Sequence, residues 1–327
     1  MREEGWREQG LPVRSMRLHD VLGCVGTATI LLLASALIPL VGPVFSLLTP
    51  LPFLYYSTKL GMNEGVKLVC GTILVTAVVS AFLRYPQMIF LCLEFSLLGL
   101  ILSELYRRQW TIGYSILVAT CSVLLIGFLV MAIAGLRKNM GPLEMIYAYM
   151  QESLRQTVQV YENMGAGPER ARAFKAYLTI VTDIISKIYP SLMIVGTGFV
   201  VWFNIIVSRP LFQMRNLAYP PYGALDRWRA PELMVWGVIA AGFSLFLPLP
   251  RIRLLATNAL IVMMAVYVFH GLSILVFYLN KYRIPPWIRF GVYFLIVFQQ
   301  IFVIGLAVAG LFDPWIDFRR IHSRKVE

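Results

Sequence analysis

The sequence contains few charged residues and very few histidines. Only 14% of its 327 residues are Asp, Glu, Lys or Arg, whereas a soluble domain usually carries about 25%. Histidine occurs 3 times, at His19, His270 and His322. This composition excludes an ordinary water-soluble domain, and it excludes a metal site built mainly from histidine.

Signatures of zinc, disulfide and enzyme chemistry are also missing. The 4 cysteines form no CxxC pair and all lie in apolar segments, at Cys24, Cys70, Cys92 and Cys121. We therefore expect packing residues rather than a disulfide framework or a zinc site. The chain has no HExxH, no GxSxG, no P-loop and no GxGxxG opening a helix after a strand. Because these motifs carry common enzyme chemistries, we predict no enzyme, no cofactor and no metal.

Long apolar blocks are what the sequence does contain. Hydrophobic residues make up 58% of the chain, and about 20 of them in a helix cross a ~30 Å hydrocarbon layer. Blocks almost free of charge lie at 21–58, 68–83, 87–104, 109–136, 188–208, 233–250, 254–280 and 290–312. We predict an all-α fold, a polytopic transmembrane helix bundle of about eight spans.

The first block is too long for one straight helix. It contains Pro39, Pro43, Pro50 and Pro52, and proline kinks or stops a helix because it lacks a backbone donor. We predict a helix over about residues 21–40 and then a broken or re-entrant segment near 40–57, buried in protein or lining a cavity. The sequence leaves open whether 21–57 crosses once or twice.

Residues 137–187 form a charged, amphipathic insert between the blocks. Pro142 suits a first helical position, and the stretch from Gly165 to Pro168 ends this helix before a second helix begins. We expect two helices along the membrane surface or on the bundle, with a solvated connector as the alternative. The chain then divides into a cytoplasmic tail (1–19), a first helix group (20–136), the insert (137–187), a second helix group (188–312) and a basic tail (313–327).

The net charge of +12 does not indicate nucleic acid. The basic residues lie in short clusters between apolar blocks, where they orient a chain and contact lipid head groups. If residues 21–57 cross the membrane once in net effect, the cytoplasmic side carries more Lys and Arg residues than the outer side. We therefore predict that the bilayer is the main partner, and that both termini and the insert are cytoplasmic.

Four polar residues within the blocks are candidates for a ligand or proton site. Glu94 would contact a cation or carry a proton, or else bond to a neighbouring helix as a neutral acid. His270 would relay protons, or else satisfy a cross-helix hydrogen bond. Asn204 and Asn258 are further candidates, with helix packing as the alternative.

Two other patterns concern contacts between segments. The pairs Gly237 with Ala241 and Gly305 with Ala309 have the small-xxx-small spacing of close helix contacts. Charged residues also flank the later spans, and they indicate either membrane anchoring or an Asp–Arg latch between loops: Arg227, Arg229, Asp313, Asp317, Arg319 and Arg320.

Three stretches carry a family resemblance: Asp226-Arg-Trp-Arg-Ala-Pro-Glu232, Pro248-Leu-Pro250 and Gly310-Leu-Phe-Asp-Pro-Trp-Ile-Asp-Phe-Arg319. With the proline-rich region from Pro39 to Tyr55, the chain resembles the YybS-like family of predicted bacterial membrane proteins. This resemblance implies a bacterial cytoplasmic membrane. It also implies a membrane region similar to the substrate-binding S components of energy-coupling-factor vitamin transporters. The family has no established activity, so it assigns no catalytic residue.

Two functions fit these observations. The first is a transporter-like, small-molecule-binding membrane unit in which Glu94, His270 and the broken segment line a midplane site. The second is a structural or regulatory scaffold for envelope-related assembly, which recruits a cytoplasmic protein through residues 141–187. An intramembrane enzyme acting on lipid would need a cluster of polar residues at one depth, and the sequence displays none.

Overall fold

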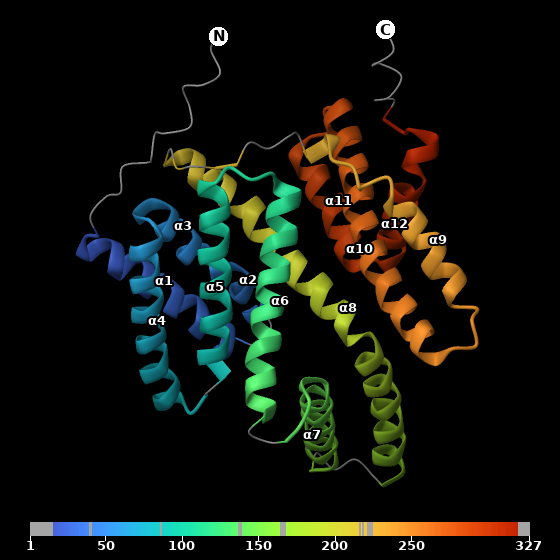
Figure 1. Ribbon diagram of the computed structural model, residues 1–327, viewed down its shortest axis with the longest axis horizontal. Coiled ribbons are helices and arrows are strands. Elements are labelled where there is room, and N and C mark those ends of the chain that lie inside the picture. Colours follow the sequence, from blue (N-terminus) through green and yellow to red (C-terminus); the bar gives the residue numbers. More distant parts are fainter. Residues whose placement is uncertain are drawn as a thin grey trace. The chain divides into compact units, whose positions relative to one another are not determined.

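The computed structural model describes residues 16–38, 41–85, 87–136, 139–163, 168–215, 217, 219–220 and 225–319. These residues form helices and no strand, which confirms the all-α prediction. The chain divides into two compact units (Figure 1): unit 1 contains 1–133 and 196–221, and unit 2 contains 134–195 and 222–327. Most of the predicted N-terminal tail and the end of the C-terminal tail, residues 1–15 and 320–327, lie outside the described residues.

Among the described helices, 6 are long and apolar enough to cross a membrane. They are α1 (Leu18–Leu37), α4 (Met62–Leu83), α5 (Gln87–Arg107), α6 (Ile112–Leu136), α8 (Pro168–Met214) and α10 (Pro250–Lys281). The last apolar block is split into α11 (Pro286–Phe298) and α12 (Gln300–Ile316), bent by 99° at their junction. The polytopic helical architecture is therefore confirmed, although α9 (Met234–Ser244) has only 11 residues.

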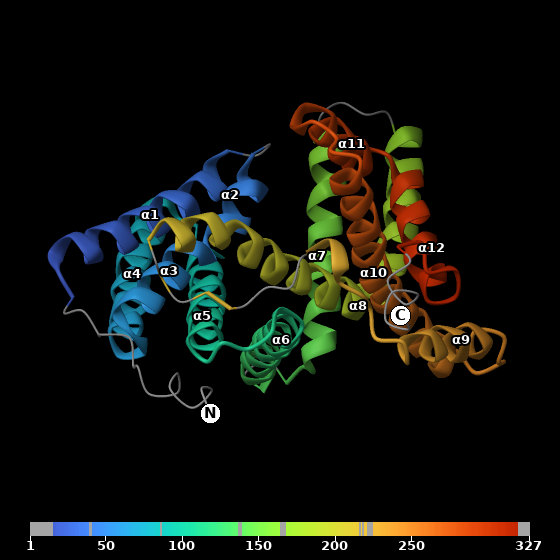
Figure 2. The ribbon, with the colours of Figure 1, turned by 90° about the horizontal axis from the view of Figure 1, so that it is seen from above.

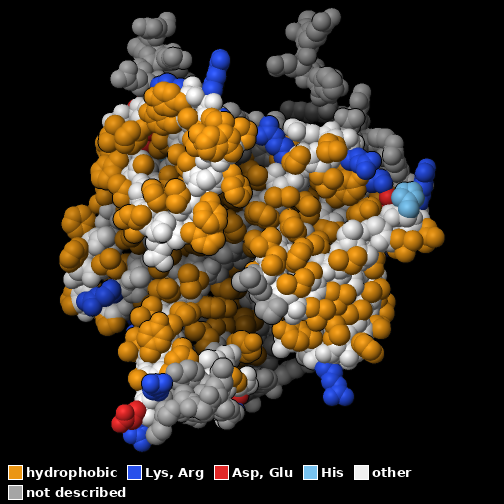
Figure 3. Space-filling model, turned by 180° about the vertical axis from the view of Figure 1, so that it is seen from behind, with side chains coloured by type: hydrophobic (Ala, Val, Ile, Leu, Met, Phe, Trp, Pro, Cys, Tyr) orange, Lys and Arg blue, Asp and Glu red, His pale blue; other side chains and the backbone are white. Residues whose placement is uncertain are grey.

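Much of the exposed surface of these helices is apolar. Leu74, Val78 and Phe82 follow one another at four-residue intervals on α4, and Phe82 is 88% exposed. Figure 3 shows hydrophobic side chains over most of the face in view, with Lys and Arg side chains near its margins. Water would penalise such a surface, whereas hydrocarbon does not, so lipid is the solvent that suits these helices.

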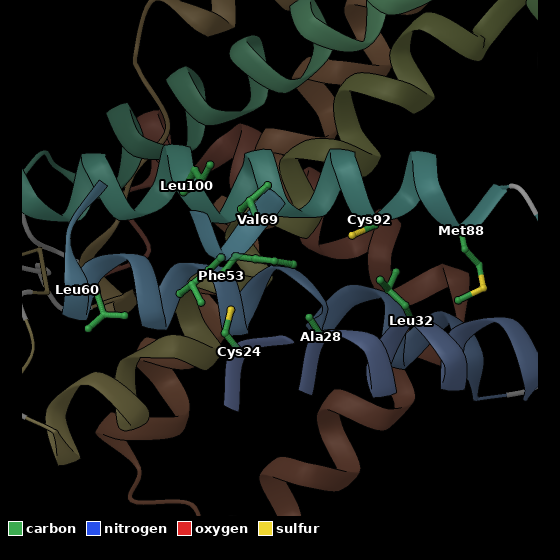
Figure 4. Close-up of a cluster of buried hydrophobic side chains, with 10 residues drawn as sticks. Cys24, Ala28, Leu32, Phe53, Leu60, Val69, Met88, Cys92 and Leu100 are labelled. Atoms are coloured by element: carbon green, nitrogen blue, oxygen red, sulfur yellow. The ribbon is translucent and has the colours of Figure 1, made fainter. Parts of the chain in front are cut away.

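Unit 1 contains the predicted broken segment. After α1 the chain forms two short helices, α2 (Gly42–Leu48) and α3 (Pro50–Leu60), which are separated at Thr49, just before Pro50. Glycine allows α3 to lie close to α5, because a Cβ at Gly99 would stand 2.8 Å from the Pro50 carbonyl oxygen. Side chains of α1, α3, α4 and α5 fill the core, among them Cys24, Phe53, Val69 and Cys92 (Figure 4).

Unit 2 contains α7 (Pro142–Asn163), the first part of α8, the short helix η1 (Leu225–Arg227), and α9 to α12. The insert therefore begins with a helix, as predicted, and its second helix is continuous with the next apolar block. On α7 the hydrogen bond from Arg155 holds the pKa of the exposed Glu152 carboxyl below its usual range. This exposed ion pair is consistent with a hydrated face on α7.

The helices α10 and α12 lie side by side (Figures 1 and 2). Two glycines allow this approach: a Cβ on Gly271 would overlap the Leu306 carbonyl oxygen, and a Cβ on Gly310 would overlap that of Tyr267. The close contact expected at Gly305 is wrong, because a Cβ there meets nothing within 4 Å in the described chain. Gly237 does lie close to a neighbour, because a Cβ added there would stand 2.9 Å from the Met263 sulfur.

Candidate functional site

The predicted site residues fall in both units. Glu94 on α5 and Asn204 on the last part of α8 belong to unit 1, whereas Asn258 and His270 on α10 belong to unit 2. Glu94 is exposed, and within the described ranges it makes no hydrogen bond or ion pair. Its neighbour one turn earlier, Phe90, is 66% exposed. The ligand or proton role of Glu94 stays a prediction.

Asn204 lies at the break between α2 and α3. Its side-chain amide donates to the Leu47 carbonyl oxygen at 2.9 Å, and also to the carbonyl oxygen of Val200, one turn earlier on α8, at 2.9 Å. Pro50 is three residues after Leu47 and has no N–H to offer that carbonyl. Asn204 thus supplies a hydrogen bond that the broken backbone lacks. Both bonds use the amide nitrogen, whereas the buried Oδ1 atom of Asn204 has no hydrogen-bond partner within the described residues.

Asn258 performs a related task at Pro190, inside α8. Its amide nitrogen donates to the Lys187 carbonyl oxygen at 2.8 Å, and its amide oxygen accepts from the Ser191 N–H at 3.0 Å. In a regular helix these two backbone groups, four residues apart, would bond to each other. Proline disturbs the helical turn that contains it, and the Asn258 carboxamide bonds to both backbone groups of this turn. It thereby joins α8 to α10.

His270 is buried, with a relative exposure of 2%, and it lies in a cluster of charged groups. Its Nε2 atom is 3.1 Å from Oδ2 of Asp313 on α12 and 3.0 Å from an Nη atom of Arg319, which follows α12. The same guanidinium nitrogen donates to Asp313 Oδ2 at 3.0 Å. The Asp313 and Arg319 side chains are 1% and 0% exposed, so the three groups form one buried network.

The end of α12 explains how Arg319 reaches His270. Pro314 weakens the last turn, and Asp317 takes the left-handed conformation with a φ of 44°, so the chain reverses. The Asp317 N–H donates to the Asp313 carbonyl oxygen at 2.8 Å, and the Phe318 N–H donates to Asp313 Oδ1 at 3.1 Å. Asp313 therefore caps its own helix with one carboxylate oxygen and contacts His270 and Arg319 with the other.

Arg319 also holds the loop before α9. Its second terminal nitrogen donates to the carbonyl oxygens of Asp226 and Trp228, at 2.9 and 3.0 Å. The same nitrogen, which carries two hydrogens, also lies 3.0 Å from Ser273 Oγ, and the Ser273 hydroxyl donates to the Trp228 carbonyl oxygen at 2.9 Å. One guanidinium thus connects α10, α12 and the loop.

A partly buried rim surrounds this buried centre. Arg229 pairs with Asp317 at 2.8 Å, Asn280 donates to the Asp226 carboxylate at 3.1 Å, and Tyr278 donates to the Phe318 carbonyl oxygen at 2.6 Å. The Asp–Arg latch considered from the sequence is therefore present. We call residues 313–319, packed on residues 226–229, the C-terminal latch.

Sequence reasoning singled out His270 but did not connect it with Asp313, Arg319 and Ser273. The signal was present: the stretches 226–232 and 310–319, which carry the family resemblance, are the two that meet in the latch. Unit 1 has a separate, partly buried ion pair that sequence reasoning also missed, between Lys59 and Asp20 at 2.5 Å. Across the described part of the chain, no three His, Cys, Asp or Glu residues are placed to hold a metal ion.

Comparison with known proteins gives one match. The model of a family described as predicted membrane protein, DUF2232, matches residues 27–314. No curated protein and no solved structure matches the chain. The match covers α2 to α11 entirely, and it ends just after Asp313 in α12. The chain therefore belongs to the DUF2232 family of predicted membrane proteins.

Proposed function

We propose that this membrane protein is a transporter-like, small-molecule-binding unit of a bacterial cytoplasmic membrane, with both termini in the cytoplasm and no catalytic activity of its own. The observation that carries the proposal is the buried network of His270, Asp313 and Arg319 between α10 and α12. Ionisable groups inside membrane bundles commonly mark solute or proton pathways.

Energetics favours a functional rather than a purely structural network. Burying an ion pair costs several kcal/mol per ion, and apolar residues of similar volume often stabilise a protein as well or better. Packing of α10 on α12 needs no charge, because Gly271 and Gly310 already bring the two backbones into contact. A buried Asp–Arg pair that also contacts a histidine is therefore better explained by binding than by packing.

The bent pair α11–α12 supports the same proposal. Its 99° bend interrupts the helix at Gln299, which has an extended backbone conformation. Irregular backbone at membrane depth is tolerated where it is buried in protein or lines a water-filled cavity. Discontinuous helices of this kind commonly form substrate sites in transporters.

The test is to purify the protein in mild detergent and identify co-purified small molecules by mass spectrometry. We expect the amount of solute that co-purifies with Asp313→Asn to be at least about tenfold lower than with the wild type, because the variant loses a carboxylate that orients the network. Ser273→Ala is a milder second variant. Glu152→Gln is the matched control, because it removes an exposed carboxylate on α7. Equal retention in Asp313→Asn and wild type, or no solute in wild type, contradicts the proposal.

A scaffold function is the second candidate, and exposed apolar residues on α7 favour it. Tyr147, Tyr149 and Val160 are 51%, 71% and 60% exposed. Under this alternative, residues 141–187 recruit a cytoplasmic protein. Deletion of residues 141–166 then removes a partner in a pull-down while the remaining helices still insert into the membrane. Pull-downs that do not change on deletion reject the scaffold.

A further inference from the structure

Three polar atoms of the network form a nearly equilateral triangle. His270 Nε2 and Asp313 Oδ2 are 3.1 Å apart, and each is 3.0 Å from the same Arg319 nitrogen. The Nε2 atom has a single in-plane position, which holds either a hydrogen or a lone pair. Arginine only donates and a carboxylate only accepts. The contact with Arg319 therefore requires a lone pair on Nε2, the contact with Asp313 requires a hydrogen there, and the two hydrogen bonds exclude each other.

We propose that Nε2 of His270 is a proton-binding site, and that Arg319 competes with the proton for the same lone pair. This inference rests on the proposed function and names its coupling ion. Without the proton, Nε2 accepts from Arg319 and the ring hydrogen lies on Nδ1, a buried atom that has no hydrogen-bond partner within the described residues. When a proton arrives from water, it bonds to Nε2 and is donated to Asp313 Oδ2, while Arg319 keeps its own protons and loses one acceptor. The summed charge of the three groups changes from zero to plus one.

The groups around His270 define the electrostatics of this step. Asp313 faces it from α12 and Arg319 from the latch, and these are the charged groups in contact with the ring. From the loop, the Trp228 ring lies edge-on with centroids 6.1 Å apart. From α10 itself, the Tyr267 ring stacks at 6.4 Å.

The nearby charges on the loop are engaged elsewhere. Arg229 pairs with Asp317, and the Asp226 carboxylate accepts from Asn280. The imidazolium would therefore face the Arg319 guanidinium directly. Both groups are buried, so little water screens their repulsion.

Proton binding at His270 consequently acts on the C-terminal latch. Arg319 connects the latch to the carbonyl oxygens of Asp226 and Trp228. A proton on Nε2 removes one of the contacts that position this guanidinium and adds a like charge beside it. The protonated state therefore favours an open latch and the neutral state a closed one, which is the property that a coupling device requires.

The tautomer of His270 tests the proposal directly. The chain has only 3 histidines, so ¹⁵N-histidine NMR in detergent is feasible, and His270→Gln assigns the signal. At about pH 8, above the ordinary titration range of histidine, we expect Nε2 to lack a hydrogen in wild type and in Arg319→Lys. In Arg319→Met the hydrogen should move to Nε2. A hydrogen on Nε2 in wild type at this pH, or an unchanged tautomer in Arg319→Met, overturns the proposal.

Hydrogen exchange of the latch amides tests the consequence. The Asp317 and Phe318 N–H groups are bonded to Asp313 in the closed latch. His270→Gln is the matched control, because its amide can bond to both Asp313 and Arg319 without titrating. At about pH 5.5, below the ordinary histidine titration point, we expect exchange roughly tenfold faster in wild type than in this control.

At about pH 8, above the ordinary titration range of histidine, we expect the two proteins to exchange equally. The proposal is overturned if the ratio of the wild-type exchange rate to the His270→Gln exchange rate is the same at both pH values. Neither readout depends on the solute. A tautomer change without solute retention would therefore reject the proposed function alone, and retention without the tautomer change would reject the proton site alone.

Discussion

Replacing Asn258 by leucine tests how α8 tolerates Pro190. The change removes two hydrogen bonds between helices, to the Lys187 carbonyl oxygen at 2.8 Å and from the Ser191 N–H at 3.0 Å. Interhelical hydrogen bonds in membrane proteins contribute about 0.6 kcal/mol each on average and about 1.7 at most. Asn258→Leu should therefore lower the free energy of unfolding by about 1 to 3 kcal/mol, measured by denaturation in mixed micelles.

A second substitution makes this test specific. In Pro190→Ala the regular helix is restored, so the Ser191 N–H can bond to the Lys187 carbonyl oxygen without help. Asn258→Leu should then cost less than about 0.5 kcal/mol, and the double-mutant cycle should show a coupling of about 1 to 2 kcal/mol. Equal costs of Asn258→Leu in the two backgrounds would refute the idea that Asn258 replaces a backbone bond broken by proline.

Three further predictions concern other contacts. Gly271→Ala should destabilise the protein by about 1 to 3 kcal/mol through overpacking, whereas Gly305→Ala, with open space around it, should change stability by less than about 0.5 kcal/mol in the same thermal melts. Tyr106→Phe should cost about 1 kcal/mol, because it removes the 2.8 Å hydrogen bond to the Ser208 hydroxyl, and the exposed Tyr114→Phe should have no measurable effect. Glu94→Gln should leave the melting temperature unchanged, because the exposed Glu94 carboxyl makes no hydrogen bond or ion pair within the described ranges; a lowered melting temperature would contradict this.

The helical architecture could be predicted because it depends on local sequence. Blocks of apolar residues identify spans from composition alone, and Pro50 marks the break between α2 and α3. The bend between α11 and α12 could not be predicted in this way. Residues 290–312 form one apolar block, and Gln299, at the bend, is flanked by neither proline nor glycine.

The candidate site was only partly predictable. His270 stands out as the only histidine in its apolar block, but its partners Asp313 and Arg319 lie 43 and 49 residues further along the chain. Their positions depend on the left-handed turn at Asp317 and on the close approach of α10 and α12. A charged stretch after a last span usually serves as an anchor, so its composition did not indicate a return into the helix bundle.

The buried ion pair between Asp313 and Arg319 is the basis of the account, and a double-mutant cycle tests it most directly. Asp313→Asn or Arg319→Gln alone leaves one uncompensated buried charge and should lower the free energy of unfolding by about 3 to 5 kcal/mol. The double variant leaves neither charge, so it should be more stable than either single variant. Denaturation of the four proteins in the same micelles gives the coupling. Costs of the two single changes that simply add, within about 0.5 kcal/mol, would contradict the buried network.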